Sequence, residues 1–429
     1  MRLVTRRRRA AWLAAGLTVV LAAASACGVG GSGDGKVHLT VSLFGQFGYE
    51  DLYKQFEKAH PGLVVTERGR GSQLSNYTPK LTQQLAAGSG AGDVVALEEG
   101  TIVGFQAQSQ QFVDLKQYGA AALEDRFLPW KWQQGQTADG KLIGLGTDIG
   151  SIAMCYRRDL FAKAGLPTGR DEVSKLWRTW DDYIAVGQRF KAANTGAKFI
   201  DGGNNAYNTI LMQQGDHTYF DRSGKLVIDT NPGVKRAFDT TVRMITGGLS
   251  AGYKSFTDQW VAGFKNGSFA TIACPAWMLG VIEGNAGPAN SGKWDVAAVP
   301  GGGGNWGGSF LAVPTQSKHP KEAAELVKFL TSPQGQLAAF KSKNNLPSSP
   351  QALDDPSLAG ATNAYFSGAP VGKIFGAGAK QLEPVYLGPK NQVVRDALEN
   401  TLVALGQGQL TPQQAWARAV ADARREAAR

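Results

Sequence analysis

The stretch GKLIGLGTDIGSIAMCYRRDLFAKAG, residues 140–165, decides how this chain is organised. It contains two apolar, strand-like runs separated by the glycine-rich turn GLGTDIG. Glycine tolerates backbone conformations that other residues avoid, so such a turn can absorb the rotation of a hinge. We therefore expect the chain to leave one lobe and enter another here.

The residues before this stretch alternate between strand and helix patterns. VHLTVSLF (37–44) predicts a strand, helical apolar spacing follows as far as HPG (60–62), and LVVTER then predicts a second strand. A helix over about 77–87 and the strand DVVALEE (93–99) come next. This alternation predicts a parallel sheet with helices on both faces. The chain has 429 residues, more than one core usually holds, so two lobes are expected.

Helices are also expected after the crossing. Thr179 and Asp182 form a capping pattern, which predicts that a helix begins at Trp180. Apolar spacing predicts further helices at 232–246, 321–342, 392–406 and 411–427.

The N-terminus has the composition of a secretory signal peptide over residues 1–26, with five arginines followed by an apolar run. This run is shorter than the roughly 20 residues of a transmembrane helix. ASAC at 24–27 resembles a bacterial lipobox with Cys27 as the lipidated residue, and residues 27–35 have the composition of a flexible tether. We expect a lipid-anchored protein, with cleavage to a soluble secreted protein as the alternative.

The charge and motif content exclude several classes of protein. The formal net charge of +10 falls to +5 when the signal peptide and its five arginines are removed, and no basic cluster remains, so we expect no nucleic-acid partner. No H-E-x-x-H or C-x-x-C motif occurs, and the four histidines are scattered. We therefore expect no metal, no other cofactor and no enzymatic activity.

Two cysteines, Cys155 and Cys274, remain after Cys27. An even number of cysteines in an exported chain suggests one disulfide. Both lie in apolar runs, so two buried free thiols are the alternative.

The stretch PGGGGNWGGSF, residues 300–310, contains a formal G-x-G-x-x-G match. A strand pattern precedes it, but a second strand pattern, SFLAVP, follows where a nucleotide site needs a helix N-terminus. The lysine of a phosphate-binding loop is also absent. A nucleotide site is therefore not expected here.

Several segments resemble extracellular solute-binding proteins of ABC importers, of the maltodextrin-binding type. They are YEDLYKQFEKAHPG, GDVVALEEG, the crossing stretch, TWDDYIAVGQRFK, SFATIACPAWMLG and GGSFLAVPTQSKHPKEAAELVKFLTSPQGQ. CPAWMLG, GNWGGSFLAVP and NLPSSP resemble in particular actinobacterial lipoproteins that bind cello-oligosaccharides. The likeness covers nearly all of 37–429. It implies a type II periplasmic-binding-protein-like α/β fold with two doubly wound lobes.

The resemblance also implies where the lobes begin and end. Lobe 1 would comprise 36–147 and 308–344, lobe 2 would comprise 151–300 and 350–429, and hinges would lie near 147–150, 301–308 and 345–349. A sugar would be held between the lobes. PGGGGNWGGSF would then serve as a hinge and cleft loop.

A pyranose ring has apolar faces and a rim of hydroxyls, which aromatic rings and carboxylates or amides suit. Trp306 stands in a glycine run and is expected to stack on the sugar, with packing between the lobes as the alternative. Trp277 is similar in placement to a sugar-stacking tryptophan of the family, with a core role as the alternative. Asp148 would contact hydroxyls or hold turn N–H groups, and Asn305 would serve the turn or the ligand.

Further candidates come from strand ends and from the resemblance. Glu98 and Glu99 end a strand where α/β proteins bind ligands, and one of them is expected to meet only solvent because consecutive strand residues face opposite sides. Gln46 and Phe47 would lie in the first cleft loop. Tyr207 matches an aromatic position of the second lobe.

Together these features predict the substrate-binding lipoprotein of a sugar ABC importer. It would be a monomer, anchored on the extracytoplasmic face of an actinobacterial-type membrane, that delivers an oligosaccharide to the transmembrane permease subunits. Cello-oligosaccharides are the first expectation, followed by xylo- and malto-oligosaccharides. The alternative is an extracytoplasmic carbohydrate-active enzyme with a carboxylate pair such as Asp148 and Glu99. A site for a metal or an anion is disfavoured by the scattered histidines and by the acids near the expected cleft.

Overall fold

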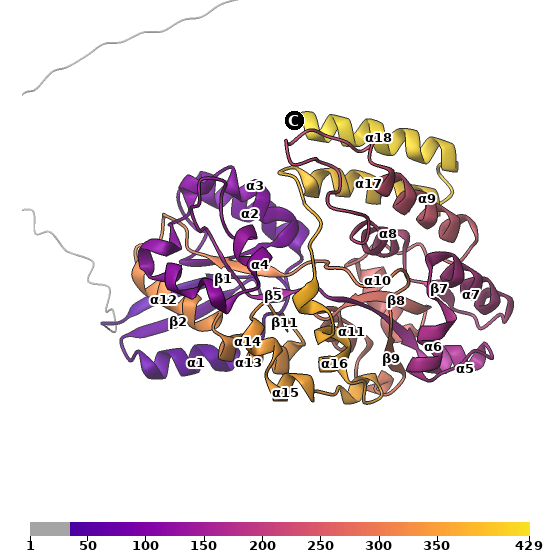
Figure 1. Ribbon diagram of the computed structural model, residues 1–429, viewed down its shortest axis with the longest axis horizontal. Coiled ribbons are helices and arrows are strands. Elements are labelled where there is room, and N and C mark those ends of the chain that lie inside the picture. The colour runs from indigo at the N-terminus through magenta and orange to yellow at the C-terminus, as the bar shows by residue number, and fades with distance from the viewer. Residues whose placement is uncertain (1–34) are drawn as a thin grey trace, which may run out of the picture. The chain divides into compact units, whose positions relative to one another are not determined.

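The computed structural model describes residues 35–429 (Figure 1). The predicted signal peptide, Cys27 and the tether up to residue 34 lie outside the described residues. Across residues 35–429, none of the helices has the length and apolar character needed to cross a membrane. Residues 37–429 form one unit built around two main sheets.

The first sheet has the strand order β2-β1-β3-β10-β4. Its strands are β1 (Val37–Ser42), β2 (Leu63–Arg68), β3 (Val94–Glu98), β4 (Leu145–Gly146) and β10 (Ser309–Ala312). β1 pairs in parallel with β2 and β3, as predicted. β10 pairs antiparallel with both β3 and β4, so the prediction of a parallel sheet is wrong for this strand. The chain enters β10 at Ser309, which pairs with Glu98 at the end of β3, so β10 runs in the opposite direction to β3.

Both faces of the first sheet are covered by helices, as predicted. Val94 and Ala96 of β3 share a core with residues of α1 (Glu50–Ala59) and α12 (Pro320–Leu330). Val95 and Leu97 share a core with residues of α2 (Leu74–Ala86) and α3 (Glu99–Gln106). A strand that is buried on both faces is apolar throughout, which explains the uninterrupted run VVAL.

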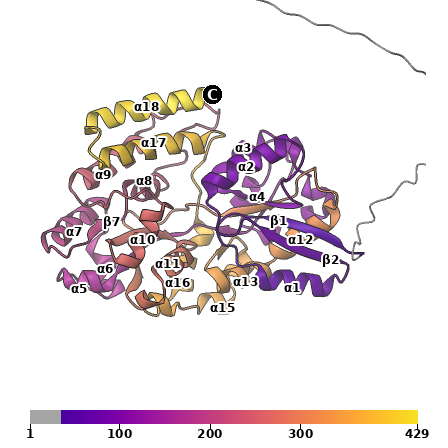
Figure 2. The same ribbon diagram turned by 180° about the vertical axis from the view of Figure 1, so that it is seen from behind.

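The second sheet has the strand order β7-β8-β6-β9. Its strands are β6 (Ile152–Arg157), β7 (Lys198–Ile200), β8 (Phe269–Pro275) and β9 (Trp294–Ala297). One face shares a core with α7 (Trp180–Ala192), α8 (Gly203–Leu211), α9 (Pro232–Thr246), α17 (Asn391–Gly406) and α18 (Pro412–Ala428). The other face packs against α10 (Asp258–Asn266), α11 (Met278–Ala286) and α16 (Val371–Gly376). Figure 2 shows α17 and α18 side by side on the flank of α8 and α9.

The helix predictions hold, with one exception. Thr179 and Asp182 form the predicted capping box, and α7 begins at Trp180. The helices predicted at 232–246, 392–406 and 411–427 are α9, α17 and α18, with ends within one residue. The single helix predicted at 321–342 is wrong, because the structure has α12 and α13 (Pro333–Lys343). Ser332 caps a new helix and Pro333, which has no N–H, stands at its first position.

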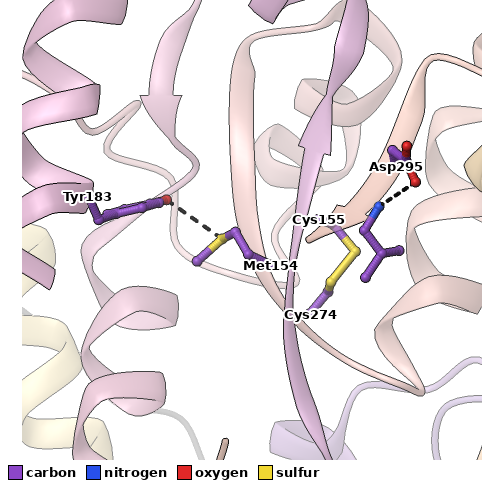
Figure 3. The surroundings of a disulfide bond; sticks show 6 residues. Met154, Cys155, Tyr183, Cys274 and Asp295 are labelled. Carbon is purple, nitrogen blue, oxygen red and sulfur yellow. Dashed lines mark hydrogen bonds between the residues drawn. A yellow bond between two sulfur atoms is a disulfide. The ribbon is translucent and has the colours of Figure 1, made fainter. Parts of the chain in front are cut away.

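The predicted disulfide joins Cys155 of β6 to Cys274 of β8, with 5.7 Å between the Cα atoms (Figure 3). Both residues are fully buried. The next side chain along β6, that of Met154, points the other way, and the Tyr183 hydroxyl donates to its Sδ at 3.7 Å. Alternate residues of β6 therefore serve the two different cores.

Three stretches of chain that run between the two sheets lie against one another. β5 (Asp148–Ile149) pairs antiparallel with β11 (Leu346–Pro347). Beside them, the Trp306 N–H donates to the Gly150 carbonyl at 2.8 Å. A Cβ on Gly150 would lie 1.7 Å from the Trp306 carbonyl oxygen, so this close approach requires glycine. The residue boundaries of the two lobes stay a prediction.

Candidate functional site

A small cavity lies where the end of β3, the start of α3, the glycine-rich crossing, α8 and α17 meet. Its volume is about 10 Å³, the space of about one water molecule. Its polar and aromatic lining includes Glu98, Glu99, Asn208, Thr218, Tyr219, Trp306, Asn391 and Arg395. Carboxylates, amides, a guanidinium and an indole are thus gathered at one buried place.

Glu99 is the first residue of α3, and its side chain is hydrogen-bonded to the glycine-rich crossing at residues 301–308. Its carboxylate accepts hydrogen bonds from Asn305 Nδ2 at 2.8 and 2.9 Å, from the Gly307 N–H at 3.0 Å and from Gln134 Nε2 at 3.1 Å. Burial raises the pKa of Glu99. Asn305 also accepts from the Gly150 N–H at 2.8 Å, so its amide holds two crossings together.

Glu98 is the N-cap of α3, and its side chain accepts from the Gly100 N–H at 2.7 Å. Burial raises the pKa of Glu98, and the nearby Arg395 acts in the opposite direction. Glu98 is 8% exposed and Glu99 is 2% exposed. The expectation that one of them meets only solvent is therefore wrong. The strand ends at Glu98 and a helix begins at Glu99, so the alternation of a strand does not apply to this pair.

A buried lysine balances these carboxylates. Lys131, in α4 (Pro129–Gln134), is fully buried, and its Nζ lies 3.9 Å from the centre of the Phe310 ring. Burial lowers the pKa of Lys131, while Glu99, Asp148 and Glu98 act to raise it. Lys131 is not among the predicted site residues, because no local pattern distinguishes it from a surface lysine.

Asp148 lies in the first crossing and is also buried. Its Oδ1 accepts from the Ser309 N–H at 2.9 Å and from the Thr147 hydroxyl at 2.6 Å. Asp148 therefore accepts from one backbone N–H, that of Ser309 at the start of β10, which agrees with one of the two roles predicted for it. Its contact with a ligand stays a prediction.

The aromatic side chains of the site form a connected group. The rings of Trp306 and Trp277 lie edge to face, 6.0 Å apart, and Trp277 Nε1 donates to the Trp306 carbonyl at 3.1 Å. Trp306 is only 9% exposed. The Phe256 ring is nearly parallel to that of Trp277, with centres 6.5 Å apart. Gln73, which precedes α2, hydrogen-bonds through Nε2 to the Phe256 carbonyl, so this group reaches the first lobe.

Three of the predicted ligand-binding residues, Gln46, Phe47 and Tyr207, do not line this cavity. Phe47 and Tyr207 are buried in hydrophobic cores, while Gln46 is exposed. Asn345, beside the third crossing, donates from Nδ2 to the carbonyls of Gln46 and Phe47 at 3.1 and 3.2 Å. Ligand contacts by these three residues stay predictions.

The residues of α8 and α17 that line the cavity are not among the predicted site residues. Asn208 Nδ2 donates to Glu399 at 2.6 Å, and Arg395 Nε lies 3.8 Å from the same carboxylate. All nine residues of α8 are buried although three of them are asparagines. Asparagines at buried helix positions are the signal in the sequence that could have revealed this part of the site.

Two α/β lobes, joined by three crossings that meet at a buried polar and aromatic cluster, define the class of two-lobed solute-binding proteins. The chain belongs to the family of bacterial extracellular solute-binding proteins, whose sequence profile matches residues 51–364.

Known proteins with similar sequence or structure agree with this assignment. The arabinooligosaccharide-binding protein of Bacillus subtilis (strain 168) is 27% identical over 336 residues, which cover 73% of each chain. A crystal structure of an extracellular solute-binding protein of family 1 is 41% identical and covers 91% of this chain and all of that one, with a TM-score of 0.80. The binding protein of B. animalis subsp. lactis Bl-04 in complex with β-1,6-galactobiose is 23% identical and covers 89% and 95% of the two chains, with a TM-score of 0.77. At 23% identity, this last structure shows only that the two proteins share a fold.

Proposed function

We propose that this chain is the substrate-binding component of an ABC importer and captures an oligosaccharide between its two lobes. The observation that carries the proposal is the buried cluster of Glu98, Glu99, Asn208, Arg395 and Trp306 where the lobes and crossings meet. Carboxylates and amides suit the hydroxyls of a sugar, and indole rings suit its apolar faces. The relatives named for arabinooligosaccharide and the structure in complex with β-1,6-galactobiose support this ligand class.

Within this class we propose a cello-oligosaccharide as the ligand. The proposal rests on the resemblance of CPAWMLG, GNWGGSFLAVP and NLPSSP to lipoproteins that bind such sugars. Xylo- and malto-oligosaccharides are the next candidates, because stacking on a pyranose face does not distinguish glucose from xylose units.

The proposed mechanism is closure of the two lobes around the sugar. Contacts from both lobes to one ligand favour the closed population over the open one, and the glycine-rich crossings take up the rotation. The closed protein, a monomer held on the outer face of the membrane by a lipid on Cys27, would then dock on the permease subunits. No cofactor takes part.

The test is a titration of residues 28–429 with cello-, xylo-, malto- and arabino-oligosaccharides of two to five units, followed by tryptophan fluorescence and calorimetry. Saturation by one series, with the sugar recovered intact, is expected. Absence of binding to every series would overturn the assignment to an oligosaccharide importer.

A carbohydrate-active enzyme is the alternative function. Its carboxylate pair would be Asp148 and Glu99, but both accept hydrogen bonds from the crossings, which suits a positioning role. Chromatography of the sugars after prolonged incubation distinguishes the two functions, because only an enzyme releases shorter products.

Trp306→Ala tests the aromatic part of the proposed site. We expect the affinity for the sugar to fall by at least about 1 kcal/mol, because an indole face that covers apolar C–H groups is lost. Trp416→Ala is the matched control: Trp416 lies on α18, packs against Phe238 and does not line the cavity. Equal affinities of the two variants would remove Trp306 from the site.

A further inference from the structure

The helix α8 carries an asparagine whose side chain has no hydrogen-bond partner among residues 35–429. Asn205 is 1% exposed, and neither its Nδ2 nor its Oδ1 makes a hydrogen bond. The two other asparagines of α8 are partnered. Asn208 donates to Glu399, and Asn204 has hydrogen-bond partners in Tyr253 and Ser255 when its amide is suitably oriented.

The position of Asn205 on α8 places it on the cavity side of the helix. Residues three and seven positions apart lie on one face of a helix, and the residues at these distances from Asn205 are Asn208 and Met212. Both line the cavity. The hydroxyl of Tyr219, another lining residue, is also buried without a partner. Asn205 therefore shares a helix face with two residues that line the cavity, and Tyr219 adds a second buried polar atom to that cavity.

A buried amide without partners costs folding free energy, so its presence needs an explanation. A primary amide offers two donors on nitrogen and two lone pairs on oxygen. A sugar hydroxyl donates one hydrogen bond and accepts others, so neighbouring hydroxyls of an uncharged sugar can satisfy both ends of the amide at once. A small ion without hydroxyls, which only accepts or only donates hydrogen bonds, would satisfy only one end.

We propose that Asn205 contacts the ligand directly, donating from Nδ2 and accepting at Oδ1, and that it selects an uncharged polyhydroxylated compound. This inference rests on the proposed function and adds to it a recognition residue on the second lobe. It implies that Asn205 is unfavourable for folding in the absence of the sugar and favourable for binding.

The test is Asn205→Leu, which keeps the approximate volume and removes both polar ends. Urea denaturation without sugar should show a midpoint equal to or higher than that of the wild type, while calorimetry should show at least a tenfold weaker affinity. The matched control is Asn290→Leu: Asn290 is also buried, but its Nδ2 donates to the carbonyls of Ala286 at 2.8 Å and Lys265 at 3.3 Å. This control should have a lower midpoint and, where it folds, wild-type affinity.

Two results would overturn the inference while leaving the proposed function intact. One is wild-type affinity of Asn205→Leu, and the other is a fall in its midpoint as large as that of Asn290→Leu. Asn205→Ala provides the same comparison if the leucine does not fit. A wild-type protein that binds no sugar would instead overturn the proposed function, and this inference with it.

Discussion

Phe256 combines an exposed aromatic ring with an unusual backbone. Phe256 is 37% exposed, its ring lies beside that of Trp277, and its φ is +66°. The left-handed region costs a residue with a Cβ about 1–2 kcal/mol. This strained residue lies beside the proposed site, and strained residues are often found at functional sites.

Replacing Phe256 by alanine and by glycine separates the strain from the ring. We expect Phe256→Gly to be more stable than Phe256→Ala by about 1 kcal/mol, because glycine adopts a positive φ without penalty. Both variants should bind the sugar more weakly than the wild type. Val261, in the middle of α10, is the control, since alanine should be more stable than glycine there by a similar amount. The stabilities are measured by urea denaturation. If alanine is more stable than glycine at both positions, Phe256 is unstrained.

Asp201 makes the stability of the second lobe depend on pH. It is almost fully buried, accepts from Trp260 Nε1 at 2.8 Å, and burial raises its pKa to about 7. Between about pH 4 and 7 the folded protein holds a proton that the unfolded chain releases, so the free energy of unfolding falls as pH rises through this window. The fall is at most about 1.4 kcal/mol per pH unit and ends above about pH 7.

Asp201→Asn should remove this contribution because an amide does not titrate. We expect the difference in free energy of unfolding between variant and wild type to grow in favour of the variant from pH 4 to pH 7 and then to stay constant. Urea denaturation at several pH values measures it. A difference that is independent of pH would show that the buried Asp201 keeps an ordinary pKa.

At the scale of elements, the crossings depend on one glycine more than on the others. The N–H of Trp306 donates to the Gly150 carbonyl, and a Cβ on Gly150 would overlap the Trp306 backbone. Gly150→Ala should therefore push two crossings apart, lowering both stability and sugar affinity by 1 kcal/mol or more. Gly303→Ala is the control, because Gly303 lies in the same glycine run, has no atom within 4 Å of an added Cβ and has no positive φ. Similar losses in both variants would mean that glycine is needed for flexibility rather than for close approach.

The elements show what local sequence patterns can predict. Helix starts such as Trp180 were predictable because the two residues of a capping box, here Thr179 and Asp182, lie three positions apart in the sequence. The direction of β10 was not, because it depends on a crossing that the local pattern does not contain. The positions of Trp306 in the glycine-rich crossing and of Glu99 at a strand end follow from local sequence, while their contacts with a ligand stay predictions. Lys131 and Arg395 were not, because their partners lie far away in the sequence and only the fold brings them together.

At the scale of the whole molecule, charged groups connect the two lobes beside the cavity. Arg395 of α17 lies 3.8 Å from Glu399 on its own helix, lines the same cavity as Glu98 of the first lobe, and has a side chain that is only 14% exposed. A buried arginine with carboxylates on both sides is costly to disrupt, because removal leaves uncompensated charges. The arrangement of Arg395 therefore favours contact between the lobes.

Arg395→Gln should weaken closure of the whole molecule around its ligand. Small-angle X-ray scattering of the wild type should show a smaller radius of gyration at saturating sugar than without sugar, because ligand binding shifts the population to the closed form. At the same sugar concentration the variant should show a smaller decrease, together with at least tenfold weaker affinity by calorimetry. Arg418→Gln is the control, since Arg418 is exposed on α18 and pairs only locally with Asp422. A variant that closes and binds as the wild type does would show that Arg395 stabilises α17 alone and that closure is driven by the crossings and the aromatic cluster.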